Sequence, residues 1–482
     1  MKKRKRCVKI IGILMVAGLL LLSGCDSLTK ITKLTADEKL KVAIIDRRKE
    51  TLKEAIEDKA DVNKLPYILG ETTYHGQHET NPLRLGFSNW VNQDMIKMLL
   101  DAGADVNAYD ADGCPVFFYS AWLDDIKLFQ MMADYAPDLT LKNKEGESIL
   151  EYYINTEETS LYYFLPKRSM VKLLLESGTP VTEKTLEYAK QYKAYHILDL
   201  LYPELKDHFS ELQKQYLQGD MWKANELLKE QKKNDETEIA VAAVYGNRET
   251  IEILEQQQVD FYKAELNEPS LLELMAWNQN LEAVSAVLET CNMPSDFDIS
   301  TLEPAIYRND DEQMMQYLCE TDRIIIGDIR EDELYYFVEA GALKTVEYLL
   351  KHGYQLSEGE YGGAQLMHSA IFEENEEMAE LLLKYGLDPN GEYADDPAWI
   401  YACDQGNTEI LDLLLEYGAD LEQYGGKAMR QAIDYCNSDV IKLLTQKGVK
   451  ITEDLYQFSQ DDIPSDHVRE YVKQLYEQQR KA

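Results

Sequence analysis

One phrase recurs four times in the second half of the chain: LLKHG at residues 349–353, LLKYG at 382–386, LLEYG at 414–418 and LLTQKG at 443–448. The glycines that close these phrases are 33, 32 and 30 residues apart. A repeat length near 33 residues predicts a solenoid of stacked helical hairpins. Because one hairpin cannot bury its own apolar face, the stack is the unit of stability. Such a stack offers a long surface to a partner, so the pattern indicates binding rather than catalysis.

The residues inside one period predict two helices. ACDQG at 402–406 reads as a helix of small residues that ends at Gly406, and NTEILDLLLEYG at 407–418 reads as an amphipathic helix that ends at Gly418. Both glycines suit a helix C-cap in the left-handed conformation. The same separation of 12 residues recurs between Gly341 and Gly353, and Gln258 stands at the equivalent distance from Gly246.

These segments resemble ankyrin repeats, whose consensus runs Thr-Pro-Leu-His, then Ala-Ala-x-x-Gly, then Val-x-x-Leu-Leu-x-x-Gly-Ala. The sequences NPL at 81–83 and DP at 396–397 supply the opening, in which a capping side chain precedes a proline at the first helical position. GESIL at 146–150 and LMHSA at 366–370 match the opening in part. The resemblance implies projecting β-turn fingers between the hairpins, and it implies that His368 ties neighbouring repeats together through hydrogen bonds.

We therefore expect an all-α, ankyrin-type solenoid of about thirteen stacked helical hairpins with short β-turn fingers over residues 40–458. The match weakens between about 185 and 235, where Leu-Leu pairs come roughly 26 residues apart and leave no room for a finger. Plain helical hairpins are an alternative there. Two segments read as insertions, 64–80 and 154–167. An amphipathic stretch from Asp466 to Arg480 predicts a closing helix within a C-terminal capping segment, 459–482.

The N-terminus resembles a bacterial lipoprotein signal peptide. Residues 1–24 combine a cluster of lysine and arginine with an apolar stretch from Ile10 to Leu22, which is too short for an ordinary transmembrane helix. LSGC at 22–25 resembles a lipobox, which implies removal of residues 1–24 and acylation of Cys25. The alternative is a signal peptide that stays uncleaved or is cleaved conventionally. Residues 25–39 would then form a tether that holds the protein at the extracytoplasmic side of a bacterial membrane.

The charge of the chain points to a basic protein as partner. The formal net charge is -37, and removal of residues 1–24 takes away six positive charges and no negative ones, which leaves -43. This charge opposes binding to nucleic acid and favours a protein with a basic surface. Many of the acidic runs are also typical of solvated helix faces. Beyond Cys25 the cysteines are scattered and odd in number, which predicts no disulfide framework, and we expect a monomer.

Motifs for catalysis and cofactors are not found in the sequence. It contains no Gly-x-Ser-x-Gly elbow, P-loop, dinucleotide fingerprint or His-Glu-x-x-His sequence. HGQHE at 75–79 brings two imidazoles and a carboxylate together but has no third partner at a predictable spacing. We therefore predict a protein that is not an enzyme and that has no cofactor and no metal site.

Four tyrosines form the one group of candidate partner-binding residues. Counted from the helix-ending glycines, they fall six to eight residues later, in the predicted fingers: Tyr109, Tyr361, Tyr393 and Tyr424. Half-exposed tyrosine is typical of interface hot spots, because it buries a large ring at a small cost in entropy. Since the chain has 32 tyrosines, packing between fingers or chance is an equally open interpretation.

The predicted function is a non-enzymatic, membrane-anchored scaffold or adaptor that binds another protein on its concave face. The alternative function is neutralisation of a basic toxin or secreted effector, an immunity-type role that the acidic charge also suits.

Overall fold

A computed structural model describes residues 34–65, 81–88, 93–155, 165–231, 234–264, 268–356, 362–393, 396–461, 463 and 465–481. Over these residues the chain is mostly helical, and its strands form one short hairpin. The signal segment, Cys25, Tyr361 and the HGQHE sequence lie outside the described residues, as do most of both predicted insertions.

Successive helices pair into antiparallel hairpins. The first helices of the pairs are α2 (Ala36–Ile45), α4 (Pro82–Ser88), α6 (Phe118–Trp122), α8 (Ile149–Ile154), α10 (Glu183–Gln191), α12 (Glu211–Gln218), α14 (Glu236–Tyr245), α16 (Leu271–Trp277), α18 (Glu303–Asn309), α20 (Glu331–Glu339), α22 (Gly363–Phe372), α24 (Ile400–Gln405), α26 (Leu421–Asp434) and α28 (Glu453–Asp461). The second helices are α3 (Lys49–Glu57), α5 (Gln93–Asp101), α7 (Ile126–Ala133), α9 (Arg168–Glu176), α11 (Leu198–Leu205), α13 (Met221–Glu230), α15 (Arg248–Gln256), α17 (Leu281–Thr290), α19 (Glu312–Glu320), α21 (Leu343–Lys351), α23 (Glu376–Lys384), α25 (Thr408–Glu416), α27 (Ser438–Gln446) and α29 (Asp466–Lys481). Short 3-10 turns η3 to η6 span Tyr195–Ile197, Lys206–His208, Ile299–Leu302 and Ile326–Asp328.

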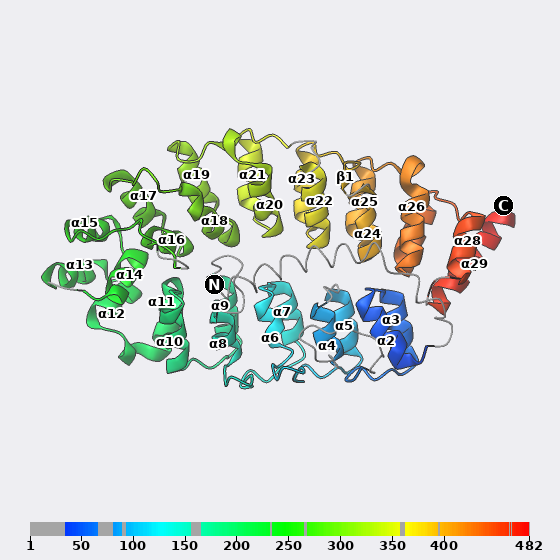
Figure 1. Ribbon diagram of the computed structural model, residues 1–482, viewed down its shortest axis with the longest axis horizontal. Coiled ribbons are helices and arrows are strands. Elements are labelled where there is room, and N and C mark those ends of the chain that lie inside the picture. The colour runs from blue at the N-terminus through cyan, green and yellow to red at the C-terminus, as the bar shows by residue number, and fades with distance from the viewer. Residues whose placement is uncertain are drawn as a thin grey trace, which may run out of the picture.

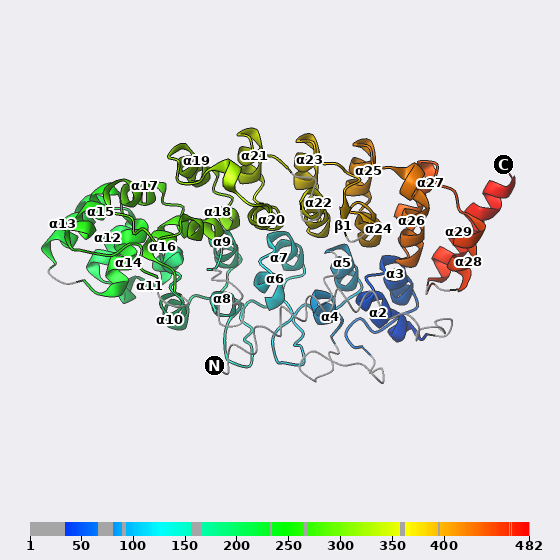
Figure 2. The same ribbon diagram turned by 45° about the horizontal axis from the view of Figure 1, so that its top comes forward.

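The pairs stack as a solenoid. Along most of the chain first helices pack on first helices and second helices on second helices. Figure 2 shows α19, α21, α23 and α25 as the upper row, with α18, α20, α22 and α24 beneath them. Among the described residues, α2 to α27 make thirteen such pairs, which confirms the predicted number.

Glycine ends the second helices as the sequence predicts. Gly353, Gly386, Gly418 and Gly448 have φ values of 106°, 91°, 99° and 101°, in the left-handed region that favours glycine. Gly246 is required for another reason, since its φ is -76°. A Cβ on Gly246 would lie 2.3 Å from the carbonyl oxygen of Ala242, so close packing excludes any side chain there.

Asparagine side chains connect neighbouring repeats. The amide of Asn390 donates to the carbonyl oxygen of Gly418 at 3.0 Å and accepts from the backbone N–H of Asp420 at 2.8 Å. Asn437 donates to the carbonyl oxygens of Cys403 and Asp404 at 2.6 and 2.8 Å. These bonds satisfy backbone groups at helix ends of the neighbouring repeat, and they therefore hold the repeats in register.

The core is continuous along the stack. The leading leucine is fully buried in the first three repeated phrases, and in the fourth it is the second leucine, Leu444. Trp399 and Cys403 are fully buried too. Cys403 stands where the ankyrin consensus has a small alanine, and its burial confirms a packing role. One apolar face therefore runs through all the repeats instead of forming separate cores.

Fingers project where the repeats are long and are missing where they are short. Strand β1 (Glu392–Tyr393) pairs antiparallel with β2 (Asp396–Pro397) in one finger, and Tyr109 bridges Pro115 in another. Between α11 and α12 only η4 and residues 209–210 intervene. This direct connection confirms that the middle of the chain has no room for fingers.

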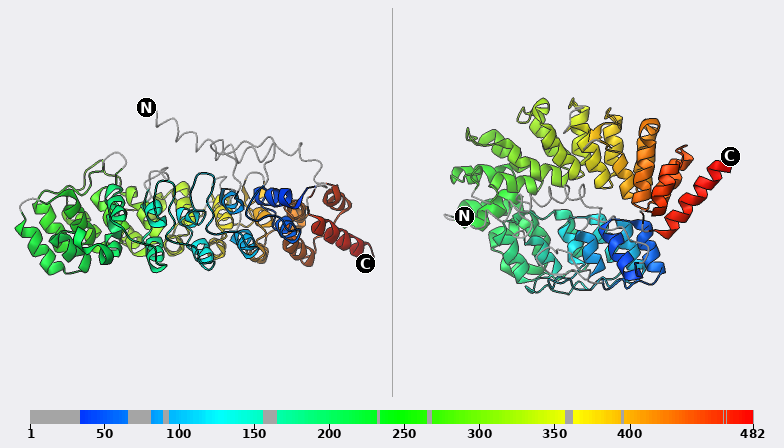
Figure 3. Two further views of the ribbon diagram at one scale, coloured as in Figure 1. Left: turned by 90° about the horizontal axis from the view of Figure 1, so that it is seen from below. Right: turned by 45° about the vertical axis from the view of Figure 1, so that its right-hand side comes forward.

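The stack bends back on itself. Figure 1 shows an N-terminal arm, α2 to α9, lying beneath a C-terminal arm, α18 to α29, with α10 to α17 forming the bend between them. The left view of Figure 3 shows that the folded stack is flat. The tips of the helical hairpins in both arms point toward each other.

Contacts join the two arms along a seam, defined here as the facing hairpin tips at residues 46–48 and 124–125 in one arm and 308–310, 372–374, 404 and 434 in the other. Arg48 Nη2 lies 3.6 Å from Asp434 Oδ1, and Arg308 forms an ion pair with Asp124. The guanidinium of Arg47 lies over the ring of Phe372, 5.8 Å from its centroid. Oppositely charged and aromatic groups therefore connect repeats that are hundreds of residues apart in the sequence.

The ends of the stack are clasped together. Glu54, a buried carboxylate on α3, accepts a hydrogen bond from the Ser465 hydroxyl and from the backbone N–H groups of Asp466 and His467, at 3.2 and 2.9 Å for the last two. These groups form the N-terminus of α29, where the helix dipole favours a negative charge. Helix α29 is the closing helix predicted from Asp466 to Arg480, and it links the last repeat to the first.

Candidate protein-binding surface

Tyr393 is the predicted tyrosine that lies deepest in a cluster of rings. Its ring is 4.6 Å from His368 on α22 and 6.3 Å from Tyr401 on α24. His368 also meets Tyr401 edge-on at 4.3 Å and stacks on Phe372 at 6.3 Å. We call Phe372, His368, Tyr393 and Tyr401 the aromatic cluster. All four are half-buried, so their rings are partly available to a partner.

His368 joins its neighbours through ring contacts. Burial lowers the pKa of its imidazole to about 4, so the side chain is neutral at physiological pH. A neutral ring adds no positive charge to the aromatic cluster, which therefore does not repel a cation.

Tyr424 does not lie in a finger, contrary to the prediction. Helix α26 begins at Leu421, because the Asp420 side chain accepts from the backbone N–H of Gln423 and caps it, and Tyr424 stands in the first turn. The repeat from Gly418 to Gly448 is shorter than the preceding ones, and the long helix α26 takes the place of a finger. The hydroxyl of Tyr424 donates to Glu392 at 3.1 Å, so it still lies beside the finger that carries Tyr393.

Tyr109 lies in a finger of the other arm. Its side chain is 48% exposed, and its hydroxyl donates to the carbonyl oxygen of Lys142 in the next finger at 3.2 Å. Among the described residues, no contact links Tyr109 to the aromatic cluster. The structure therefore brings Tyr393 and Tyr424 together, separates Tyr109 from them and does not describe Tyr361.

Tyr335, His368 and Tyr401 form a ladder that the sequence prediction missed. They stand 33 residues apart, one per repeat, on α20, α22 and α24. The hydroxyl of Tyr335 donates to Glu339 at 3.1 Å, and the neighbouring Tyr336 is 42% exposed. The exact spacing of 33 residues is the signal in the sequence that indicates this ladder. Counting from the helix-ending glycines finds only tyrosines of the predicted fingers.

Carboxylates surround the seam side of this ladder. Burial raises the pKa of Asp404 to about 8, and Asp434 and Asp396 add to the shift, whereas Arg47 and a hydrogen bond from Gln431 oppose it. Oδ1 of Asp404 is buried without a hydrogen-bond partner. The Asp404 carboxyl at this edge of the ladder therefore holds its proton at physiological pH and ionises only as the pH rises through about 8.

Glu374, at the tip between α22 and α23, faces the N-terminal arm. Burial raises the pKa of Glu374 to about 7, with Asp94 and Asp125 adding to the shift and Lys49 and Lys127 opposing it. Removing a carboxylate from water disfavours its charged form, so both Glu374 and Asp404 hold protons more tightly than usual.

Raising the pH from about 6 to about 9 is expected to weaken the seam. In the closed form Asp404 and Glu374 keep protons that they lose once the arms separate, because closure raises their pKa values to about 8 and about 7. Closure is therefore strongest in acid and weakens as the pH rises through those values, by at most about 1.4 kcal/mol per group and pH unit. Hydrogen exchange at residues 373–375, corrected for its intrinsic pH dependence, measures the change.

A variant that combines Asp404→Asn with Glu374→Gln is the control for this titration. It should make seam protection clearly less dependent on pH over the same range, and Glu373, whose pKa burial raises to about 7, accounts for the dependence that remains. A wild-type seam that is equally protected at both pH values would contradict the prediction.

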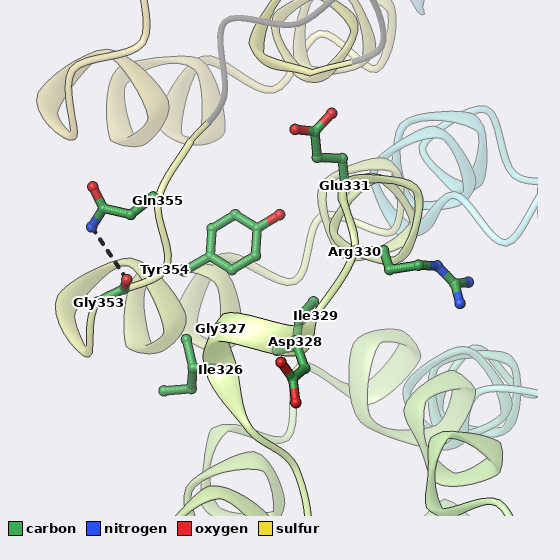
Figure 4. Close-up of a pocket in the computed structure, with 9 residues that line it drawn as sticks. All are labelled: Ile326, Gly327, Asp328, Ile329, Arg330, Glu331, Gly353, Tyr354 and Gln355. Atoms are coloured by element: carbon green, nitrogen blue, oxygen red, sulfur yellow. Dashed lines mark hydrogen bonds between the residues drawn. The ribbon is translucent and has the colours of Figure 1, made fainter.

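A separate shallow pocket of about 370 Å³ lies between η6 and the end of α21. Figure 4 shows the ring of Tyr354 standing between Ile326 and Ile329 on one side and Glu331 on the other. Burial and the nearby carboxylates, Glu331 first, raise the pKa of Tyr354 to about 12, so it stays protonated. None of the predicted site residues lines this pocket.

In the part of the chain that the structure describes, no group of three or more histidine, cysteine or acidic side chains is placed to hold a metal ion. None of the cysteines described there forms a disulfide: Cys114, Cys291, Cys319, Cys403 and Cys436. None of the described helices has the length and apolar character needed to cross a bilayer.

A comparison with protein families agrees with this geometry. Residues 302–393 and 391–454 match the family model for ankyrin repeats in three copies. The matched region contains the aromatic cluster, the β1–β2 finger and all four repeated phrases. Over residues 302–454 the chain is therefore similar to ankyrin repeats.

Proposed function

We propose that this protein is a non-enzymatic scaffold that binds a basic protein and that a lipid on Cys25 holds it at the extracytoplasmic face of a bacterial membrane. The observation that carries the binding role is the run of ankyrin repeats over residues 302–454, because ankyrin repeats generally bind other proteins. The stacked helices supply a rigid surface, so a partner can dock with little change in the backbone.

The closed shape of the stack favours one part of that surface as the binding site. The seam uses the hairpin tips of both arms for contacts within the chain, so those tips are not free for a partner. The ladder and the β1–β2 finger of the C-terminal arm stay half-exposed. We therefore assign partner binding to the fingers and first helices of this arm, including Tyr393 and Tyr424.

The charge supports a basic partner. The whole chain carries -37, and ionised carboxylates outnumber lysine and arginine by 87 to 50. A surface of this sign attracts basic proteins over distances of about a Debye length, roughly 8 Å at physiological salt. Association should slow as salt is added, because screening weakens the long-range attraction.

The anchor is tested by the change Cys25→Ser. The wild-type protein recovered from bacterial membranes should lack residues 1–24 and carry acyl chains on Cys25, as intact mass analysis would show. The variant should stay as an unprocessed, unacylated precursor, because serine supplies no thiol for the lipid. The matched control is Cys7→Ser, which lies in the removed segment and should leave processing unchanged. Wild-type protein without acyl groups would refute the anchor.

Binding is tested by crosslinking in intact bacterial envelopes, followed by measurement of the association rate of the purified pair. The expected partner is basic, and its association rate should fall steeply between low and high salt. A partner without a basic surface, or an association rate that ignores salt, would contradict the proposal. A captured toxin or secreted effector whose activity is blocked would identify the neutralising role instead of the scaffold.

A further inference from the structure

The chain already holds one guanidinium at the edge of the aromatic cluster. Arg47, at the α2–α3 tip of the N-terminal arm, reaches across the seam and lies over the ring of Phe372. Burial lowers the pKa of Arg47, and Tyr435 and Asp404 oppose that shift. An aromatic face beside a carboxylate is the environment in which arginine gains both cation–π and charge attraction.

The same chemistry continues outward from Arg47. Phe372 stacks on His368 with an angle of 17° between the rings, and His368 contacts Tyr401 and Tyr393. These rings come from α22, β1 and α24, so they line the surface between the finger and the first helices. The neutral faces of these rings extend far enough for several side chains of one extended peptide to contact them.

Acidic residues flank these rings on both sides, and Glu392 is the exposed one. Asp404 lies at the seam edge with Oδ1 buried and without a hydrogen-bond partner. Glu392 lies at the finger edge, where it accepts the hydroxyl of Tyr424. Lys427 pairs with Asp396, so its charge is already partly neutralised.

We propose that the aromatic cluster, flanked at its finger edge by the exposed carboxylate of Glu392, docks an arginine-rich segment of the partner protein. This inference rests on the proposed function, because it names the part of the partner that the C-terminal arm recognises. The guanidinium of Arg47 over Phe372 shows the contact that each docked arginine would make with a ring. Arginine suits the site better than lysine, since its planar group stacks on a ring and still donates to a carboxylate.

The test uses a fluorescent peptide of alternating arginine and glycine and a matched peptide with glutamine in place of arginine. Fluorescence anisotropy with the purified protein measures both affinities. The arginine peptide should bind. Tyr401→Leu or Tyr393→Leu should weaken its affinity about tenfold, because leucine removes the aromatic ring but keeps a side chain of similar volume. Tyr401→Phe keeps the ring and should bind as the wild type does.

The matched control is Tyr109→Leu, which removes a finger tyrosine from the other arm and should leave the affinity unchanged. Circular dichroism melting of each variant identifies any loss of fold, and the phenylalanine variant keeps the test valid if a leucine variant melts early. Equal binding of the two peptides would overturn the proposal. So would equal weakening by Tyr109→Leu and Tyr401→Leu, which would indicate general attraction to an acidic surface.

The two proposals fail in distinguishable ways. If the crosslinked partner binds and Tyr401→Leu does not affect it, the docking site is wrong and the scaffold function stands. If the arginine peptide docks on the ladder but no basic partner is found in envelopes, the scaffold function fails and the site remains.

Discussion

Leu414→Ala is expected to destabilise the C-terminal arm by about 2–5 kcal/mol. Leu414 is fully buried on α25, in the apolar face that the repeats share. The substitution removes this packing and leaves a cavity between neighbouring repeats. Because each repeat contacts mainly its neighbours, protection from hydrogen exchange should fall most in α23 to α27.

The contact between Glu54 and the N-terminus of α29, called the clasp here, makes the expected effect differ from that in an open stack. Helix α29 contacts α3, so part of the loss should reach α3 while the bend from α12 to α17 stays protected. The matched control is Leu415→Ala, one residue away and only partly buried, which should cost clearly less. Equal loss of protection in the bend and in α25 would contradict local coupling.

Glu54→Ala is expected to release α29 from α3. The carboxylate of Glu54 accepts from Ser465, Asp466 and His467, and hydrogen bonds to a charged group contribute about 1.5–3 kcal/mol each. Alanine leaves the first N–H groups of α29 without this acceptor and removes the negative charge at the helix N-terminus. We expect a cost of about 2–4 kcal/mol to closure, with faster hydrogen exchange in both α3 and α29.

Glu57→Ala is the matched control for the clasp. Glu57 lies one turn further along α3, is exposed, and approaches His467 Nε2 only to 3.9 Å. An exposed ion pair of this kind contributes little, so this variant should leave α29 protected. If the two variants behaved alike, the carboxylate of Glu54 would not be what closes the stack.

Local features of the fold could be predicted from the sequence because they depend on short stretches. The spacing of the LLKYG-type phrases predicted the hairpins, and the left-handed glycines confirmed where the second helices end. Asp466 to Arg480 predicted α29, since an amphipathic period of one helix is visible without any partner.

The placement of the tyrosines in fingers could be predicted only in part, and their role in binding stays a prediction. Tyr393 stands in a finger as expected, but Tyr424 does not, because the Asp420 cap starts a helix where counting from Gly418 predicted a turn. Tyr335, His368 and Tyr401 were visible as a period of 33 residues. Whether these three side chains can contact a partner depends on which face of each first helix is exposed. The period alone does not specify that face.

The sequence by itself determined the repeat unit, its helix caps and its buried leucines, because each follows from the conformational preferences of neighbouring residues. Only the tertiary structure decided that the stack folds back and closes. The clasp joins Glu54 to groups 411 to 413 residues away. A small rotation between repeats accumulates over the whole stack, so the meeting of its ends depends on every repeat at once. No local sequence pattern determines this accumulated rotation. The exposed aromatic surface and the seam contacts between the arms both follow from the rotation.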